Sequence, residues 1–283
     1  KNGIEPQLIF VRGAPTVVAA LASGDMDIGY TGGTAVLGAS AAGIDLRILA
    51  VLTNRVTYDL VARPGIKSAE DLRGKRFGVT SIGGTLWMGG VLGLEKIGLD
   101  IARDDIRVLV IGDQVVLSQA LEDNRIDATV LDMVFSKRLA QKGFPILAEL
   151  HKTNLPITST SIVARQGYVQ KNPQLMENFM KAVMEGIAFV LGPPNKAATI
   201  KLLQRRLHVS EREAEEGFVD MLIGMDKKPF PSMEGLRNIQ RLMKQRNPKM
   251  AGIKVEELVD DQILRRLDES GFIDKLFAAH GVK

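Results

Sequence analysis

Ala20-Leu-Ala-Ser-Gly-Asp-Met-Asp-Ile-Gly-Tyr-Thr-Gly-Gly-Thr34 is the stretch of this sequence that best indicates the fold. Gly24 ends a helical pattern over residues 15–23, because glycine readily adopts the left-handed conformation that closes a helix. The apolar residues 28–30 predict a short strand, and a glycine-rich turn then opens a second helix over residues 34–42. Helix, strand and helix joined by such short turns indicate an α/β fold.

The same succession of apolar run, polar turn and amphipathic stretch repeats up to about residue 165. Several of the apolar runs contain almost no polar residue, which is typical of strands covered by helices on both faces. The predicted strands are 8–11, 28–30, 46–52, 58–62, 77–80, 108–111, 128–131, 146–147 and 159–164. The predicted helices of this part are 15–23, 34–42, 85–97, 115–123 and 133–142.

Beyond Gly167 the strand signals end and long helical periods follow. Pro193-Pro194 and Pro229-Phe230-Pro231 separate them, because proline cannot continue a helix. We therefore predict a helical C-terminal portion, with helices at 173–191, 195–207, 210–222, 232–244 and 255–269.

The tripeptide Val-Ala-Arg ends two β-prone segments, residues 59–63 and residues 161–165. We interpret these as paired hinge strands on either side of an inserted lobe, and the alternative is a coincidence between two β-prone segments. The hinge interpretation assigns residues 1–64 and 159–283 to a first lobe and residues 65–158 to a second.

The composition is that of an ordinary globular protein, with 283 residues, 45% hydrophobic and 25% charged. No apolar run reaches the ~18 residues of a membrane span, and the N-terminus lacks the apolar core of a signal peptide, so we expect any export signal to lie outside this sequence. The absence of cysteine excludes disulfides and thiolate chemistry. His151, His208 and His280 stand far apart and are expected at the surface, so neither a metal nor a cofactor is predicted.

The formal net charge is +4, and basic residues are interleaved with acidic ones, as in Glu211-Arg212-Glu213. Only 5% of the residues are aromatic, so a basic stripe with stacking rings, as nucleic-acid binding requires, is not present in the pattern. We predict no nucleic-acid partner, although a modest positive potential can steer anions toward a cleft.

Segments spread along the chain resemble, in order and spacing, the nitrate, sulfonate and taurine substrate-binding proteins of ABC importers. They are residues 20–34, 65–79, 119–130 and 168–173. The resemblance implies a type II periplasmic-binding fold, in which two α/β lobes with mixed sheets and flanking helices are joined by crossover strands around a ligand cleft. Members of the family begin with one more strand and helix, so the resemblance also implies that the first lobe lacks this opening unit here.

Two similar loops, one in each predicted lobe, follow a strand and open a helix: Tyr30-Thr31-Gly32-Gly33-Thr34 and Ser81-Ile82-Gly83-Gly84-Thr85. A helix start offers unpaired N–H groups and a positive dipole end, which together can hold an oxyanion. Glycine lets the backbone approach the ligand closely, and the hydroxyl groups either add donors or cap the helix. We predict that the ligand binds between these two loops.

Other candidates follow from neighbouring strand ends. Asp113 is expected to cap a helix, whereas Asp132 either caps one or contacts an amine or hydroxyl of the ligand. Trp87 either covers an apolar part of the ligand or fills the core. The family pattern further implies that Asn54, Ser159 and Thr160 line the floor of the cleft.

The resemblance implies a solute-binding protein that captures a small anionic molecule by hinged lobe closure and presents it to an ABC permease at the inner membrane. It further implies a monomer that is periplasmic or lipid-anchored. One alternative is a sensory or regulatory domain of the same fold, which would need an attached DNA-binding or membrane segment. Another is an enzyme like the pyrimidine synthases of thiamine biosynthesis, whose His and Cys cluster around iron is not matched here. The solute itself is left open among nitrate, alkylsulfonates, taurine, bicarbonate, aromatic acids and pyrimidines.

Overall fold

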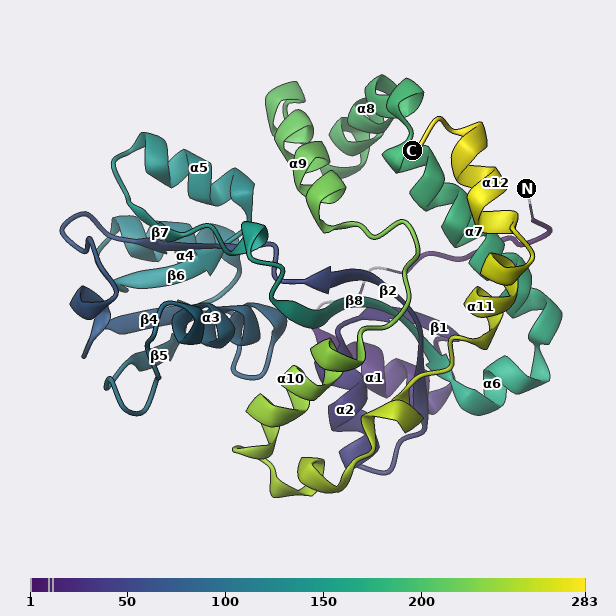
Figure 1. Ribbon diagram of the computed structural model, residues 1–283, viewed down its shortest axis with the longest axis horizontal. Coiled ribbons are helices and arrows are strands. Elements are labelled where there is room, and N and C mark those ends of the chain that lie inside the picture. Colours follow the sequence, from purple (N-terminus) through teal and green to yellow (C-terminus); the bar gives the residue numbers. More distant parts are fainter. Residues whose placement is uncertain (1, 10, 12, 283) are drawn as a thin grey trace. The chain divides into compact units, whose positions relative to one another are not determined.

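A computed structural model describes residues 2–9, 11 and 13–282 of the chain (Figure 1). These residues form two compact units, each with its own sheet. Unit 1 comprises residues 1–54, 157–218 and 225–283, and unit 2 comprises residues 55–156 and 219–224.

Unit 1 contains a sheet with the strand order β1-β8-β2. β1 runs antiparallel to β8, with Ile28 opposite Ala164 and Thr31 opposite Ser161. Figure 1 shows α7, α11 and α12 on one side of this sheet and α1, α2 and α10 on the other. The elements are α1 Ala14–Ser23, β1 Ile28–Thr31, α2 Gly33–Ala41, β2 Leu46–Arg55, β8 Pro156–Arg165, α6 Gln166–Lys171, α7 Pro173–Leu191, α8 Lys196–Leu207, α9 Glu211–Gly224, α10 Met233–Lys244, α11 Gln262–Glu269 and α12 Phe272–Ala279.

The core of unit 1 lies between the sheet and α7. Met176, Met180 and Met184 recur every four residues on α7, so they share one helix face, and each is fully buried. They pack with Ile162 and Ala164 of β8, which point to the same side because they are two residues apart in a strand. This burial attaches the C-terminal helices to the strands.

Unit 2 contains a sheet with the order β5-β4-β6-β3-β7. β4 runs parallel to both β5 and β6, whereas β3 runs antiparallel to β6 and β7. The elements are β3 Asp59–Ala62, β4 Arg76–Val79, α3 Thr85–Lys96, β5 Arg107–Val110, α4 Gln114–Glu122, β6 Ala128–Leu131, α5 Met133–Gln141 and β7 Ile146–Ala148.

One face of the unit 2 sheet is covered by α3 through glycines. A Cβ atom on Gly90 would lie 2.6 Å from the Phe77 ring, and one on Gly93 would lie 2.4 Å from Leu150. Glycine at these positions therefore lets α3 lie close to the sheet at Phe77 and to the turn that contains Leu150. The other face is covered by α4 and α5, where Leu117, Leu121 and Leu139 form a buried cluster.

The hinge-strand hypothesis is wrong. Residues 59–62 form β3, which pairs with β6 and β7 in unit 2, whereas residues 161–165 end β8, whose neighbours in unit 1 are β1 and β2. β2 extends to Arg55, beyond the predicted 46–52, so β2 and β8 are the strands that reach the unit borders. The borders fall at 54/55 and 156/157, not at the predicted 64/65 and 158/159, and residues 219–224 also belong to unit 2.

Two further element predictions fail. The predicted strand 8–11 includes Phe10, which lies outside the described residues, and Leu8, Ile9 and Val11 form no strand; Leu8 is 87% exposed. The predicted helix 255–269 is broken, because Val259 pairs with Ile48 and α11 begins only at Gln262. Helices α6 and α12 were not predicted. The α/β class and the helical C-terminal portion are confirmed.

Within the described part of the chain, no helix combines the length and the apolar character needed to span a membrane.

The amino ends of β4 and β6 and the carboxyl end of β3 are held by the Asp127 carboxylate, which lies between two arginines. The Asp127 side chain is 4% exposed and accepts hydrogen bonds at 2.9 Å from the backbone N and the Nε of Arg76, while Arg63 Nε lies 2.9 Å away. The hydrogen bond from Arg76 is the main cause that lowers the pKa of Asp127 to about 2. The ionised form of Asp127 is thus favoured by folding.

Replacing Gly90 by alanine tests the contact between α3 and the sheet. Phe77 is 2% exposed and cannot move aside, so we expect Gly90→Ala to lower the free energy of unfolding by about 1–3 kcal/mol in urea titrations. The matched control is Gly186→Ala on α7, where no atom lies within 4 Å of the new Cβ, and which should stabilise by up to about 1 kcal/mol. A Gly90→Ala protein as stable as its parent would contradict the packing account.

Replacing Asp127 tests how much its interactions with Arg63 and Arg76 contribute to stability. Because its pKa is depressed, the carboxylate contributes stability that is present above its ordinary pKa of 3.8 and is lost as the pH falls through about 2. We expect Asp127→Asn to lower the free energy of unfolding at pH 7 by only on the order of 1 kcal/mol, because Arg63 and Arg76 are about one-third exposed and solvent screens their charges. In denaturant titrations, the difference in the free energy of unfolding between parent and variant should shrink as the pH falls toward 2. A difference that does not change with pH would show that the ionised Asp127 carboxylate is not the source of the stability.

Candidate functional site

In unit 2, α3, α4 and α5 all begin at one edge of the sheet. β5, β4 and β6 are adjacent and parallel, so their carboxyl ends, Val110, Val79 and Leu131, lie at the same edge. The short segments after these strands lead directly into α4, α3 and α5. Ligands of open α/β sheets bind outside this edge, because unpaired N–H groups of the helix starts meet there.

The loop before α3 requires glycine at position 83 and is tightly packed around Gly84. Gly83 has a φ of 84°, in the left-handed region that residues with a side chain rarely adopt. A Cβ on Gly84 would lie 2.5 Å from Ser81 Oγ. Gly84 is also the N-cap of α3, so no side chain caps this helix at that position. Ser81 is exposed and Thr85 is half-buried on the first turn, which leaves their hydroxyl groups beside the helix start.

α4 differs from α3, because its start is already satisfied. Asp113 accepts hydrogen bonds from the backbone N–H groups of Val115 at 3.0 Å and Val116 at 3.1 Å. The predicted N-cap role of Asp113 is confirmed.

Asp132 occupies the N-cap position of α5 but does not cap its own helix. Gln114 holds it instead: the Gln114 side-chain amide donates to the Asp132 carboxylate, and Gln114 Oε1 accepts from the Asp132 backbone N–H at 2.7 Å. Burial raises the pKa of Asp132, the hydrogen bond from Gln114 lowers it, and the charge of Asp59 raises it. The one sequence signal for Gln114 is its position directly after the predicted cap Asp113.

Behind Asp132 lies a second carboxylate that the sequence analysis missed. Asp59 is 2% exposed, accepts a hydrogen bond from Ser136 Oγ at 2.6 Å and lies 2.7 Å from His151 Nδ1. The side chain of His151 is 10% exposed, so the expectation of a surface histidine is wrong for this residue. His151 is drawn inward because it supplies a hydrogen-bonding partner that a buried carboxylate needs.

Trp87 is 7% exposed on the first turn of α3 and therefore lies in the interior of unit 2. Of the two roles considered for its indole, the packing of this unit favours the core role.

The loop of unit 1 is built differently. Thr31 ends β1 and is 9% exposed, whereas Tyr30 is 61% exposed and has the Thr160 side chain as a hydrogen-bond partner. Gly32 is the N-cap of α2, so this helix, like α3, has no side-chain cap. A Cβ on Gly33 would lie 2.8 Å from Thr158 of β8, so this glycine is required by internal packing.

The remaining candidates of unit 1 lie on or beside β8. Thr34 is half-buried on the first turn of α2, and Ser159 and Thr160 are half-buried in β8. The Asn54 side chain is committed to the protein: its amide donates to the Phe230 carbonyl at 2.8 Å and its oxygen accepts from the Ser232 backbone N–H at 2.9 Å. Asn54 thus fastens the end of β2 to residues 226–232.

Surface cavities of ≈390 and ≈500 Å³ in unit 1 and of ≈350 Å³ in unit 2 contain none of the predicted site residues. Within residues 2–9, 11 and 13–282, no group of three or more His, Asp and Glu side chains is placed to hold a metal ion. The Gly32-Gly33 turn lies in unit 1 and the Gly83-Gly84 turn in unit 2.

Comparison with solved structures identifies the fold. The fold is that of periplasmic binding proteins: it is similar to the periplasmic aliphatic sulphonate-binding protein SsuA of Escherichia coli, with a TM-score of 0.68, 20% identity and coverage of 87% of this chain and 79% of that one. It is also similar to a periplasmic sulfonate-binding protein, SsuA, from Methylobacillus flagellatus, with a TM-score of 0.71, 18% identity and coverage of 90% and 79%.

A family model places the chain more narrowly. Residues 1–197 match the NMT1/THI5-like family, and the chain belongs to this family. A protein of Brucella abortus that is named as a binding protein is 27% identical to this chain over 224 residues. The aligned part covers 77% of this chain and 68% of that relative. These findings confirm the predicted resemblance to ABC-type substrate-binding proteins and the predicted fold.

The same fold also serves an enzyme. The desulfurization enzyme DszB has a TM-score of 0.61 and 16% identity, and the comparison covers 86% of this chain and 85% of the enzyme. The fold alone therefore does not decide between binding and catalysis.

Removing Gln114 tests its hold on Asp132. Because its hydrogen bond favours the ionised carboxylate, we expect Gln114→Leu to raise the pKa of Asp132 further, as followed by NMR titration of the Asp132 carboxyl carbon. Asp113→Asn is the control, because it changes a neighbouring carboxylate and leaves the Gln114–Asp132 pair in place. An Asp132 pKa that stays the same or falls in Gln114→Leu would rule out the positioning role.

Proposed function

We propose that the protein is the solute-binding component of an ABC importer, which captures a small anionic solute without chemical change by closing its two units on it. The proposal rests on one observation: the first turns of α2 and of α3 have no side-chain cap. Both helices begin at a glycine N-cap that provides no side chain to satisfy the first-turn amides, whereas α4, at the same sheet edge as α3, is capped by Asp113. Uncapped helix starts next to Gly-Gly turns suit an oxyanion.

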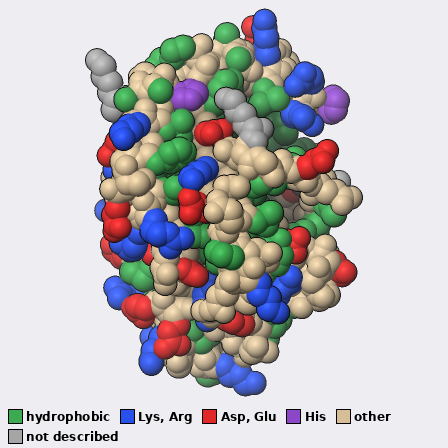
Figure 2. All heavy atoms as spheres, turned by 90° about the vertical axis from the view of Figure 1, so that its right-hand side faces the viewer, with side chains coloured by type: hydrophobic (Ala, Val, Ile, Leu, Met, Phe, Trp, Pro, Cys, Tyr) green, Lys and Arg blue, Asp and Glu red, His purple; other side chains and the backbone are tan. Residues whose placement is uncertain are grey.

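The names of the similar proteins support this choice of ligand class. Two structures that share the fold are sulfonate-binding proteins, and a sulfonate group presents three oxygen atoms to backbone donors. The positive formal charge of the chain favours anions at long range. On the face shown in Figure 2, Lys and Arg side chains are mixed with Asp and Glu side chains, a distribution that supports no single strongly basic binding surface.

The mechanism is hinge closure at the ends of β2 and β8. The chain crosses between the units at 54/55 and 156/157, at the ends of β2 and β8, and again at 218/219 and 224/225, around the last turn of α9. Movement of the units therefore needs backbone rotations at the strand ends together with an adjustment at the end of α9. The solute favours the closed form only by its higher affinity for that form. The closed form is then the one that a membrane permease recognises, with the protein acting outside the cytoplasm as a monomer.

Thr34 and Thr85 are the residues with which we test the proposal. If their hydroxyl groups donate to the bound solute, Thr34→Val and Thr85→Val should each weaken binding by about 1 kcal/mol, or roughly fivefold in Kd. The solute is first found by a thermal-shift screen of nitrate, bicarbonate, taurine, alkylsulfonates, aromatic acids and pyrimidines, and affinities are then measured by calorimetry.

Thr16→Val provides the matched control. Thr16 is exposed on the first turn of α1, a helix that also begins after a glycine N-cap, and its replacement should leave the affinity unchanged. Stabilisation by neutral or cationic compounds alone would contradict an anionic ligand. Unchanged affinity in both test variants would remove the two helix starts from the site, and consumption of the solute during incubation would indicate an enzyme.

A further inference from the structure

The last turn of α9 is attached to unit 2 by polar contacts. α9 begins in unit 1, but Val219–Gly224 belongs to unit 2. Arg55 Nη1 donates a hydrogen bond to the Ile223 carbonyl at 3.3 Å, and the Val134 backbone N–H donates to the Asp220 carboxyl group. Val219 and Leu222 are each 41% exposed, so much of the apolar surface of this turn is not used for attachment.

Asp220 supplies the side-chain cap that the start of α5 lacks. Asp132 stands at the N-cap but makes no side-chain cap, and Val134 is on the first turn, where N–H groups have no partner within the helix. The Asp220 carboxyl group accepts the Val134 N–H and so caps α5 from another helix. The turn and α5 are therefore coupled through one carboxyl group.

This carboxyl group lies among charges of its own sign. Asp132 at the start of α5 and Asp59 on β3 face it, with Lys137 of α5 as the opposing cation, and Asp220 Oδ1 is buried without a hydrogen-bond partner among the described residues. Burial first, and the charge of Asp132 second, raise the pKa of Asp220 to about 6.

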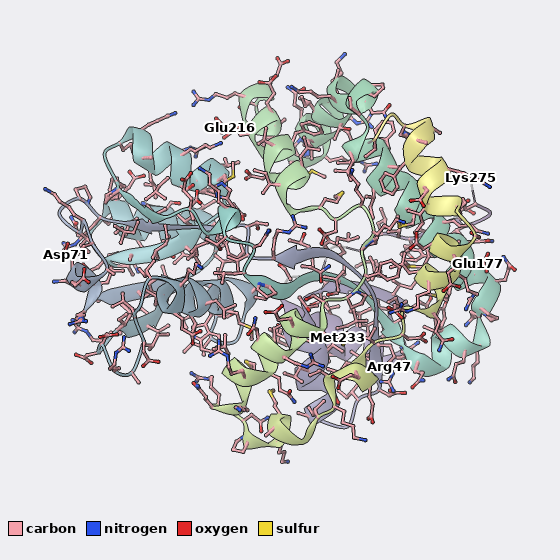
Figure 3. All side chains as sticks on the ribbon, in the orientation of Figure 1. Arg47, Asp71, Glu177, Glu216, Met233 and Lys275 are labelled. Atoms are coloured by element: carbon pink, nitrogen blue, oxygen red, sulfur yellow. The ribbon has the colours of Figure 1, made fainter. Side chains whose placement is uncertain are left out.

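The other charged groups nearby are already engaged. His151 lies against Asp59. Glu216, one helical turn before Asp220 and labelled in Figure 3, is paired with Arg212 at 3.0 Å. These pairs leave Asp220 without a dedicated cation on its own helix.

We propose that Asp220 is a pH-sensitive latch, whose bound proton keeps the last turn of α9 docked on unit 2 and whose ionisation loosens that turn. The docked turn binds the proton more tightly than a solvent-exposed aspartate does, because docking buries the carboxyl group beside Asp132. Docking is therefore favoured below the ordinary pKa of 3.8 and is progressively weakened as the pH rises through about 6. The hydrogen bond from Val134 and the charge of Lys137 oppose this loosening without cancelling it.

The latch goes beyond the proposed function and does not require it. Its consequence for solute capture does rest on the proposed function. A loosened turn would make the chain less constrained where it leaves unit 2 at residue 224, which is one of the places where the chain crosses between the units.

The test uses the ligand-free protein, so its outcome is independent of any solute. The chain contains no cysteine, and Leu222→Cys therefore introduces a single site for an environment-sensitive fluorophore on the turn. We expect the fluorescence to titrate between about pH 4 and pH 8 with a midpoint near 6. The midpoint should vanish in Asp220→Asn/Leu222→Cys, because the amide cannot ionise.

Two further variants make the result decisive. Glu215→Gln/Leu222→Cys removes an exposed carboxylate of the same helix and should retain the midpoint near 6. Asp132→Asn/Leu222→Cys removes the repelling neighbour and should shift the midpoint downward. Circular dichroism checks that each variant is folded. A midpoint that persists in the Asp220→Asn protein, or a parent signal that does not change with pH, would overturn the latch, whatever the binding assays show.

Discussion

The parallel alignment of β5, β4 and β6 is the constraint on which the unit 2 site depends. Parallel strands must all end at the same edge, so the segments that leave them meet there without any specific contact between their side chains. The glycine loop of α3, the cap of α4 and the Asp132–Gln114 pair are consequences of that alignment. α3 can pack closely against the face of the sheet because Gly90 has no side chain that would meet Phe77.

The unit 2 edge combines helix N-termini, which favour an anionic ligand, with nearby buried carboxyl groups, which favour a cationic one. Burial raises the pKa of both Asp132 and Asp220, which means that the surroundings of these two side chains disfavour their negative charge. Asp59 is instead satisfied by Ser136 and His151.

The sequence predicted most of the regular elements, because their signals are local. Gly24 closes α1 with a φ of 92°, as its position after an apolar helix indicated, and Asp113 caps α4. The sheet assignments could not be obtained in this way: β3 is as apolar as β2, and only pairing with β6 and β7 places it in unit 2. Asp59, His151 and Asp220 were missed for the same reason. Asp59 and His151 are 92 positions apart, Asp220 meets the start of a different helix, and no periodicity connects any of them with its partner. Gly33 was assigned to ligand approach, yet its proximity to Thr158 follows from a strand far along the chain.

The methionine face of α7 gives unit 1 an unusual chemical vulnerability. Thioethers are readily oxidised to polar sulfoxides, and Met176, Met180 and Met184 are shielded from dissolved oxidants only while α7 stays packed on the sheet. A sulfoxide formed during a brief opening would no longer fit the apolar interior and would hinder repacking. Oxidative damage at these positions would therefore accumulate at a rate set by how often unit 1 opens, and each event would make the next one easier.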